Sequence, residues 1–364
     1  MKIAVIGGGS TYTPELVNGF LARSGRLALD ELWLMDIDAR RLEVVGRFAQ
    51  RMVKAAGDPF RVVLTGSQKD AIEGAAYVIT QFRVGMMPAR RGDEYLGKRH
   101  GLIGQETTGV GGMAKGLRTI PVALRIAADI RETAPGALLL NFTNPAGLIT
   151  EALTRYAPDV STVGVCNVGI TTKKHMLERL QAMTGQEINP QRAQLNTLGL
   201  NHLTWHRGFT LDGEELWPQL FRGYVEEARS EEHPEWDVHT LESLGMLPNY
   251  YLQYFYYTGH KLQEQEKWPP SRAEEVMEIE KELLREYADP RLTKPPEDLM
   301  KRGGAYYSTL ATELIESHCN DLGQVHVVNV RHDGQVRGWP DDWVVEMPAR
   351  VDRKGVHPLS AEPL

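Results

Sequence analysis

The sequence predicts an α/β protein in which a doubly wound, mostly parallel sheet is followed by an α+β domain. Short apolar runs alternate with longer amphipathic segments through the first half of the chain. The first apolar run leads into a glycine-rich turn, Gly7-Gly8-Gly9, and the next segment has helical periodicity. The 364 residues are 42% hydrophobic and 24% charged, which is typical of a globular protein. That length suits two packed domains, which we place at 1–168 and 169–364.

The elements of the first half follow from this alternation. Apolar runs of strand length predict strands near residues 2–6, 31–35, 61–64, 76–82, 137–142 and 161–166. The amphipathic segments between them predict helices near 13–24, 39–56, 68–74, 115–134, 145–156 and 171–183. Helices that connect successive strands in this way build a parallel sheet with helices on both faces. Ligands of such a sheet are expected at the carboxyl ends of the strands.

Residues 83–114 interrupt the alternation. The stretch is rich in glycine and carries several basic residues, which predicts a long functional loop. The second half begins with β-like stretches at 194–200 and 203–211. Helical segments and a final β-like pair then follow, near 219–230, 273–287, 304–319, 325–331 and 343–346.

Charge and cysteine content indicate that the partners are small molecules. Lys and Arg total 41 against 48 Asp and Glu, so the formal net charge is −7 and neither nucleic acid nor a membrane surface is expected as a partner. Only Cys166 and Cys319 occur, which argues against a disulfide framework. No apolar run approaches the ~20 residues of a membrane helix. We therefore expect a cytoplasmic protein.

The turn after the first strand has the features of a dinucleotide site of the Rossmann type. Gly7 and Gly9 precede a predicted helix, and Asp36 ends the second strand, where a carboxylate accepts the ribose hydroxyls of NAD and repels the 2′-phosphate of NADP. The third glycine of the usual fingerprint is replaced by Tyr12. The alternative is a glycine-rich turn that binds nothing.

Cys166 and His202 are candidate metal ligands. Cys166 ends the sixth predicted strand, and His202 lies between the first two strands of the second half. One thiolate and one imidazole would leave most of a metal's coordination open for substrate or water, as in a catalytic site. The alternative is a buried cysteine that packs as a small apolar group and a histidine with a structural hydrogen bond.

Two further motifs have both a functional and a structural interpretation. Asn141 and Asn144 close the fifth strand with amides that suit nicotinamide or sugar hydroxyls, or that cap the helix after Pro145. The aromatic run at 250–257 is most often a buried helix face.

The assembled motifs resemble glycoside hydrolase family 4, the NAD- and metal-dependent glycosidases, and within it the 6-phospho-β-glucosidases. The segments that carry the resemblance are GGGSTYTPEL at 7–16, FRVGMMPARRGDE at 82–94, GLIGQETTGVGGMAKGLRTIP at 101–121, NFTNPAGL at 141–148, CNV at 166–168, GLNHLTW at 199–205, LPNYYLQYFY at 247–256 and SRAEEVMEIEKELL at 271–284.

The resemblance implies a lactate/malate dehydrogenase-like fold and a role for each site residue. Cys166 and His202 are implied ligands of a divalent metal, usually Mn²⁺, and Tyr251 is the implied catalytic base. The residues implied to hold the sugar or its phosphate are Arg90, Asn144, Asn167 and Arg272. The residues expected to bind NAD are Gly7, Gly9, Ser10, Thr11 and Asp36.

The residue after the cysteine is similar to that of members acting on phosphorylated β-glucosides, because Asn167 stands where other members have histidine. Gly169 replaces the usual proline, which is expected to loosen this turn. The family also continues beyond the position of Leu364, so the carboxyl-terminal tail is expected to be short or missing. A homodimer or homotetramer is expected.

The implied reaction is hydrolysis through transient oxidation of the sugar. Ordinary glycosidases use two carboxylates, and NAD-dependent members of this family are exceptions. NAD oxidises C3, Tyr251 removes the C2 proton, the aglycone is eliminated, water adds, and C3 is reduced again. The alternatives are an NAD-dependent 2-hydroxy-acid dehydrogenase using His202 and Arg90, a family member acting on unphosphorylated glycosides, and a nucleotide sensor without catalysis.

Overall fold

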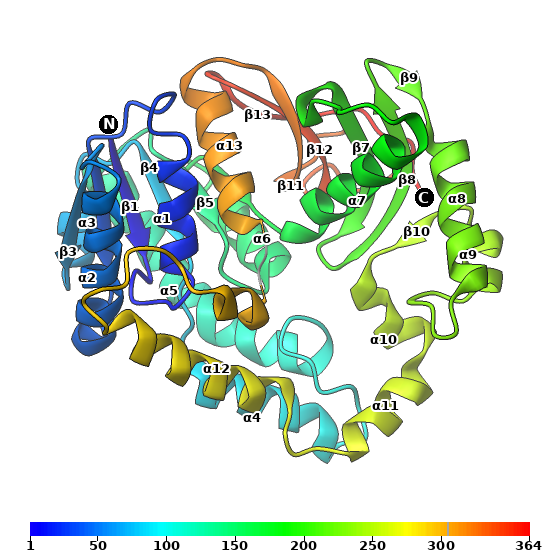
Figure 1. Cartoon of the computed structure of the whole chain (residues 1–364), viewed down its shortest axis with the longest axis horizontal. Helices are drawn as coiled ribbons and strands as arrows, with labels where there is room; N and C mark the ends of the chain where they lie inside the picture. Colours follow the sequence, from blue (N-terminus) through cyan, green and yellow to red (C-terminus); the bar gives the residue numbers. More distant parts are fainter. Residues whose placement is uncertain (304–305) are drawn as a thin grey trace.

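The computed structural model describes residues 1–303 and 306–364, and their strands form two sheets (Figure 1). The larger sheet has nine strands, in the order β13-β12-β11-β6-β5-β4-β1-β2-β3. Their bounds are β1 Lys2–Ile6, β2 Glu31–Met35, β3 Arg61–Thr65, β4 Tyr77–Thr80, β5 Leu138–Asn141, β6 Thr162–Gly164, β11 Gln324–Arg331, β12 Val344–Asp352 and β13 Gly355–Pro358.

The first six strands pair in parallel and confirm the predicted doubly wound sheet. The last three strands pair antiparallel and extend the sheet from β6 outward, so the carboxyl-terminal part of the chain completes a sheet begun by the first half. The proposed boundary at 168/169 falls within the first turn of α7 (Asn167–Thr184) and stays a prediction.

Helices cover both faces of the larger sheet. One apolar core lies against α1 (Thr13–Leu21), α2 (Ala39–Ala55) and α13 (Tyr307–Cys319). The core on the other face includes side chains of α3 (Gln68–Ile72), α5 (Gly109–Thr133) and α6 (Ala146–Tyr156). The predicted helices of the first half are therefore confirmed, with ends that differ by a few residues.

The expectation of a long loop at 83–114 is wrong, because this stretch contains α4 (Met86–Arg99) and the start of α5. Its glycines allow close packing. A Cβ on Gly97 would lie 2.3 Å from the carbonyl oxygen of Ile103, and one on Gly111 would lie 2.1 Å from that of Gln105. Segment 103–107 is thereby held tightly between the two helices.

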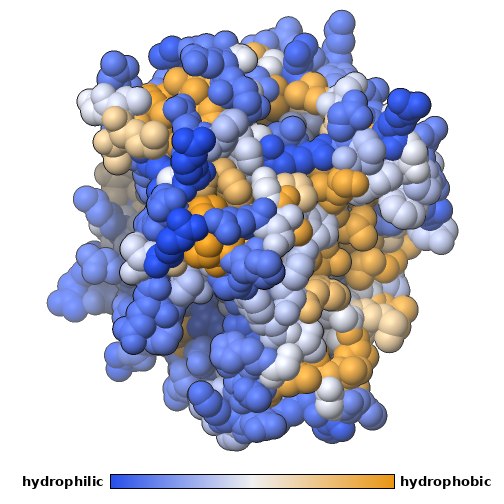
Figure 2. Space-filling view, turned by 90° about the vertical axis from the view of Figure 1, so that its right-hand side faces the viewer, coloured by the Kyte–Doolittle hydropathy of each residue, from blue (hydrophilic) through white to orange (hydrophobic). Residues whose placement is uncertain are grey.

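A third core joins α7 to the smaller sheet, in which β10, β8 and β7 are neighbours and β9 pairs with β8. The elements of this part are η1 Pro190–Arg192, β7 Ala193–Leu200, β8 Leu203–Leu211, β9 Glu214–Glu215, α8 Trp217–Ser230, α9 Val238–Leu244 and β10 Leu247–Pro248. On the face to the right of Figure 1, apolar patches alternate with polar ones (Figure 2). Within the described ranges, no helix has the length and apolar character needed to span a membrane.

The aromatic run at 250–257 is not the single buried helix face that was expected. It forms η2 (Tyr250–Leu252) and α10 (Gln253–Tyr256), and Tyr250, Phe255 and Tyr256 are exposed. Three more helical segments lead to α13, with bounds α11 Thr258–Glu266, α12 Arg272–Tyr287 and η3 Glu297–Arg302. The helix α12 packs along α2 and α4 at the lower edge of the molecule (Figure 1).

Candidate functional site

Cys166 lies where the chain leaves the larger sheet, between β6 and α7. It immediately precedes the helix, and its side chain is buried. Burial and the nearby Glu346 carboxylate raise the pKa of the thiol, and hydrogen bonds from the side chains of Asn201 and Tyr307 only partly oppose this rise. The side chain is therefore a neutral thiol unless a cation favours the thiolate.

His202 lies in the turn between β7 and β8, with a positive φ of 67°. Its Nδ1 pairs with the hydroxyl of Thr107 at 3.0 Å. Burial lowers the pKa of His202 to about 3, so the imidazole is neutral, which is the form that binds a metal. With Nδ1 engaged by Thr107, Nε2 is the nitrogen left for a ligand.

Tyr251 lies directly against His202. The side chain of Asn249 accepts a hydrogen bond from the Tyr251 amide at 3.1 Å, which fixes the start of η2. The Tyr251 ring stacks on the His202 imidazole, with centroids 3.8 Å apart and an interplanar angle of 9°. The phenol and the candidate metal ligand therefore belong to one site.

Electrostatic coupling extends this site to Cys166 and Arg90. Burial raises the pKa of the Tyr251 phenol, Cys166 and Glu106 raise it further, and Arg90 lowers it. Such couplings between buried groups act at short range. The structure thus brings together four residues that the sequence predicted, which are Cys166, His202, Tyr251 and Arg90.

Cys166 and His202 fit a divalent metal ion as two of its ligands. The Thr107 hydroxyl holds the imidazole in place, as outer-shell partners of metal-binding histidines do. Among residues 1–303 and 306–364, no group of three or more His, Cys, Asp or Glu side chains is placed to hold a metal. Two protein ligands leave coordination positions for substrate oxygens or water, which is the pattern of a catalytic site.

Arg90 belongs to a buried charged cluster centred on Glu106, which the sequence analysis did not identify. Glu106 forms ion pairs with Arg83, with Arg90 at 3.2 Å and with Lys115 at 2.6 Å. Arg90 also pairs with Glu94 at 2.9 Å. The sequence did contain one indication of this cluster, because Glu106 is the single acidic residue in the glycine-rich stretch 101–112.

The charges of this cluster are set by burial and by one another. Burial alone would raise the pKa of Glu106, but Arg83, Lys115 and Arg90 hold it well below its usual range. Burial and Arg83 lower the pKa of Lys115 to about 7, although Glu106 opposes the change. Glu106 is therefore an anion that fixes the surrounding cations, and it is not a proton donor near neutrality.

The glycine turn fits a dinucleotide. Gly7 has a φ of 96°, and a Cβ on Gly9 would lie 2.8 Å from the Asp36 carboxylate, so both positions require glycine. The Gly9 amide donates to Asp36 Oδ2 at 2.8 Å. Ser10 is partly exposed just before α1 begins, and the side chain of Ile37 is 91% exposed beside Asp36, where it offers an apolar surface to a base. The N-terminus of α1 completes an anion-binding turn.

We predict that Asp36→Ala weakens NAD⁺ binding at least about tenfold and NADP⁺ binding much less. The carboxylate accepts ribose hydroxyls but repels a 2′-phosphate. Dissociation constants from calorimetry test this, with Asp36→Asn as a control that retains an acceptor for Gly9. Equal losses for both cofactors would mean that Asp36 acts only through the glycine turn.

Four other predicted residues lie as follows in the described part of the chain. The Thr11 hydroxyl is buried and donates to Glu280 at 3.2 Å. Arg272 pairs with Glu275 and donates to the Lys301 carbonyl. Asn144 accepts from the Ala146 amide at 3.2 Å, as the capping alternative foresaw, and Asn167 begins α7 beside Cys166. Their binding roles stay predictions.

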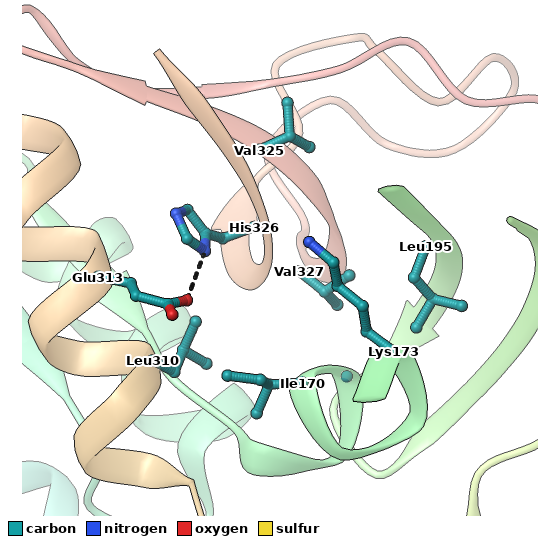
Figure 3. A pocket seen from close by; sticks show the side chains of 9 residues that line it. Ile170, Lys173, Leu195, Leu310, Glu313, Val325, His326 and Val327 are labelled. Carbon is teal, nitrogen blue, oxygen red and sulfur yellow. Dashed lines mark ion pairs between the residues drawn. The ribbon is translucent and has the colours of Figure 1, made fainter. Parts of the chain in front are cut away.

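Gly169 does not loosen the turn after Cys166, contrary to the expectation. It is buried in the first turn of α7, and a Cβ there would lie 2.8 Å from the side chain of Val327 on β11. A small cavity of about 30 Å³ remains beside it, lined also by Lys173, Glu313 and His326 (Figure 3). The glycine is therefore required by close packing between α7 and β11.

Glu346 on β12 is a second residue of the site that the sequence analysis missed. It lies opposite Asn329 in the sheet, which in turn lies opposite Gly164 of β6. Its Oε2 accepts from Asn201 at 2.6 Å and from Asn329 at 3.4 Å, whereas Oε1 is buried without a partner among the described residues. Burial raises the pKa of this carboxyl to about 7, and the two amides only partly oppose the rise.

We predict that Glu346 makes the metal-free protein less stable as pH rises. The folded-state pKa of about 7 lies above the ordinary 4.5, so stability falls between these values by roughly 3 kcal/mol and the penalty is complete above pH 7. Glu346→Gln removes the ionisation, and its amide has the unpartnered Asn329 oxygen as an acceptor. Urea unfolding in EDTA at pH 5 and 8 should show a smaller pH dependence in the variant. An identical dependence in both proteins would contradict the assignment.

Known proteins resemble this chain over almost its whole length. Residues 2–182 match the profile described as family 4 glycosyl hydrolase, and residues 197–364 match the profile of the C-terminal domain of that family. A probable 6-phospho-β-glucosidase of Bacillus subtilis is 42% identical over 370 residues, which cover 99% of this chain and 82% of that protein.

Solved structures support the fold independently. The 6-phospho-β-glucosidase of Thermotoga maritima, solved with manganese, NAD⁺ and glucose-6-phosphate, has a TM-score of 0.92 at 36% identity and covers 100% of this chain and 84% of its own. A lactate dehydrogenase from Eimeria maxima has a TM-score of 0.58 at 15% identity, covering 99% of this chain and 88% of that one. The expected dehydrogenase-like fold is confirmed.

Proposed function

The chain belongs to the family 4 glycosyl hydrolases, and from this premise we propose that it hydrolyses 6-phospho-β-glucosides with NAD and a divalent metal ion, Mn²⁺ in the first instance. The observation that carries the proposal is the convergence of Cys166, His202 and Tyr251 at one buried site. Relatives named 6-phospho-β-glucosidase, and the neighbour solved with NAD⁺, manganese and glucose-6-phosphate, support this choice of substrate and cofactors.

When bound, NAD supplies a hydride acceptor and donor for the sugar C3 and the metal supplies a Lewis acid whose charge also favours the Tyr251 phenolate. Cys166 and His202 would hold that metal through Sγ and Nε2. Tyr251 Oη takes the proton from C2 once C3 is a ketone, and loss of the aglycone from C1 follows.

The remaining residues orient the sugar. Arg90 is fixed by Glu94 and Glu106, so its guanidinium is positioned in advance for a sugar hydroxyl or phosphate. Asn144, Asn167 and Arg272 are proposed to complete the sugar and phosphate contacts. A cytoplasmic location and a homodimeric or homotetrameric assembly are part of the same proposal.

We predict that p-nitrophenol is released from p-nitrophenyl β-glucoside 6-phosphate at least about tenfold faster, in kcat/KM, than from the plain β-glucoside. Loss of one charged hydrogen bond to phosphate accounts for a factor of this size. The assay is run with and without NAD⁺ and Mn²⁺, and turnover should require both.

The same assay separates the alternative functions. NADH is re-oxidised in each glycosidase cycle and should not accumulate, whereas a 2-hydroxy-acid dehydrogenase would release it stoichiometrically. Equal kcat/KM values for the two glucosides would overturn the phosphate preference but leave the glycosidase assignment in place. Absence of turnover on every glucoside would overturn the assignment itself.

A further inference from the structure

Arg302, the last residue of η3, is a largely buried cation that none of the roles above uses. Its side chain is 19% exposed and donates twice to Glu280 Oε1, from Nε at 3.3 Å and from Nη2 at 3.1 Å. Its Nη1 has no hydrogen bond within residues 1–303 and 306–364. The guanidinium therefore has a fixed position and donor capacity to spare.

Glu280, the partner of Arg302, is tied to the glycine turn. It is buried on α12, accepts from the Thr11 hydroxyl at 3.2 Å and pairs with Arg41 at 3.2 Å. Arg41 in turn donates from Nε to the carbonyl of Gly9 at 3.3 Å. In Figure 1 the chain that leaves the end of α12 passes across the ends of α1 and α2, in agreement with these contacts.

Aromatic contacts place Arg302 between the glycine turn and the catalytic centre. Its guanidinium lies over the ring of Tyr12, 5.9 Å from the centroid. Tyr12 contacts the ring of Tyr307 edge-on at 6.0 Å. The side chain of Tyr307 hydrogen-bonds the Cys166 thiol. The side chains of Tyr12 and Tyr307 thus connect Arg302 with Cys166, a candidate metal ligand.

The ion pairs that Arg302 and its neighbours form contain more cations than anions. Four guanidiniums, those of Arg41, Arg83, Arg90 and Arg302, face three carboxylates, those of Glu94, Glu106 and Glu280. Lys115 adds to the positive side when it is protonated. Burial lowers the pKa of Arg302, and Arg83 and Arg90 lower it further, so the three cations lie near one another. Buried cations in excess of their partners favour an anionic ligand.

We propose that Arg302, held in place by Glu280, is a phosphate-binding residue of the active site. Two ligands of the proposed function carry such a group, NAD with its pyrophosphate and the sugar with its 6-phosphate. The contacts of Glu280 with Thr11 and Arg41, and that of Arg302 with Tyr12, favour the pyrophosphate. The sugar phosphate is a ligand only if the proposed function holds. Binding of NAD⁺ can be measured without turnover, so that alternative is tested separately.

The test measures dissociation constants of NAD⁺, and of glucose 6-phosphate at saturating NAD⁺, by calorimetry. Arg302→Gln should weaken one of the two ligands at least about tenfold, the loss expected for one charged hydrogen bond. A selective loss for NAD⁺ identifies the pyrophosphate as the ligand, and a selective loss for glucose 6-phosphate identifies the sugar phosphate. Arg302→Lys keeps the charge and should lose less than Arg302→Gln.

Arg285→Gln is the matched control, because Arg285 is an exposed arginine of α12 whose partner is Glu282. Wild-type affinity for both ligands in Arg302→Gln would overturn the proposal. Equal losses in Arg302→Gln and Arg302→Lys, accompanied by a lowered Tm, would also overturn it, because they would indicate a structural role only. If wild type binds NAD⁺ but turns over no glucoside, the proposed function fails while the NAD⁺ measurements still decide the role of Arg302.

Discussion

Tyr251→Phe is expected to lower kcat by a factor of about 10² to 10⁴, the range that a positioned general base contributes. The substitution keeps the ring that stacks on His202 at 3.8 Å and removes only the phenolic oxygen. Folding, NAD⁺ affinity and Mn²⁺ affinity should therefore stay near wild type. Steady-state kinetics, calorimetry and thermal melting measure these quantities separately.

Isotope exchange shows whether that loss belongs to the C2 proton step. Turnover of wild type in D₂O should leave deuterium at C2 of the product, because the redox route breaks this C–H bond and direct displacement does not. Tyr250→Phe, at the exposed neighbouring tyrosine, serves as the control and should behave like wild type. Product without deuterium over many turnovers would exclude the redox route. Full exchange in Tyr251→Phe would give the role of base to another group.

The sheet was predictable because its central parallel strands are buried on both faces. Such strands appear in the sequence as continuous apolar runs, and helical periodicity separates them. The strands β11 to β13 come from distant sequence and pair antiparallel, and no local pattern in 324–358 indicates that they extend the first sheet. Their attachment is a tertiary event that brings Glu346 to the site.

The error at 83–114 has a local physical cause. Glycine usually weakens a helix, so a glycine-rich stretch was interpreted as a loop. Gly97 and Gly111 instead sit where a Cβ would meet backbone within 2.3 Å, and their absence of side chains lets segment 103–107 pass between α4 and α5. This segment supplies Glu106 and Thr107 to the site.

The site was predictable where it depends on motifs and not where it depends on pairing across the fold. Cys166 and His202 each lie in a recognisable segment, and the structure joins them through Tyr251. The buried partners Glu106 and Glu346 stand in segments without such a signal. Each of these carboxylates acquires its role through a partner from another part of the chain, Arg83 for Glu106 and Asn201 for Glu346.

Substitution of Cys166, like that of Tyr251, should have a large effect. We expect loss of the metal together with loss of turnover. Cys166→Ala removes one of two protein ligands, so Mn²⁺ affinity and kcat are both expected to fall by at least about 10²-fold. Replacement of an outer-shell partner typically costs about 10 to 100-fold, so Thr107→Val should give a smaller loss of the same kind through His202 Nδ1. Chelation should abolish wild-type turnover, and added Mn²⁺ should restore it.

Cys319→Ser provides the control, because the chain contains only these two cysteines and Cys319 lies at the end of α13, where its sulfur contacts the Glu316 carbonyl. Metal binding is measured by calorimetry in the presence and absence of glucose 6-phosphate, apart from activity. Cys166→Ala with wild-type Mn²⁺ affinity would remove the thiol from the metal site. Loss of turnover with intact metal affinity would instead place Cys166 beside the sugar. A decrease in Mn²⁺ affinity from wild type through Thr107→Val to Cys166→Ala is expected if the metal lies between Cys166 and His202, since the Thr107 hydroxyl hydrogen-bonds the imidazole.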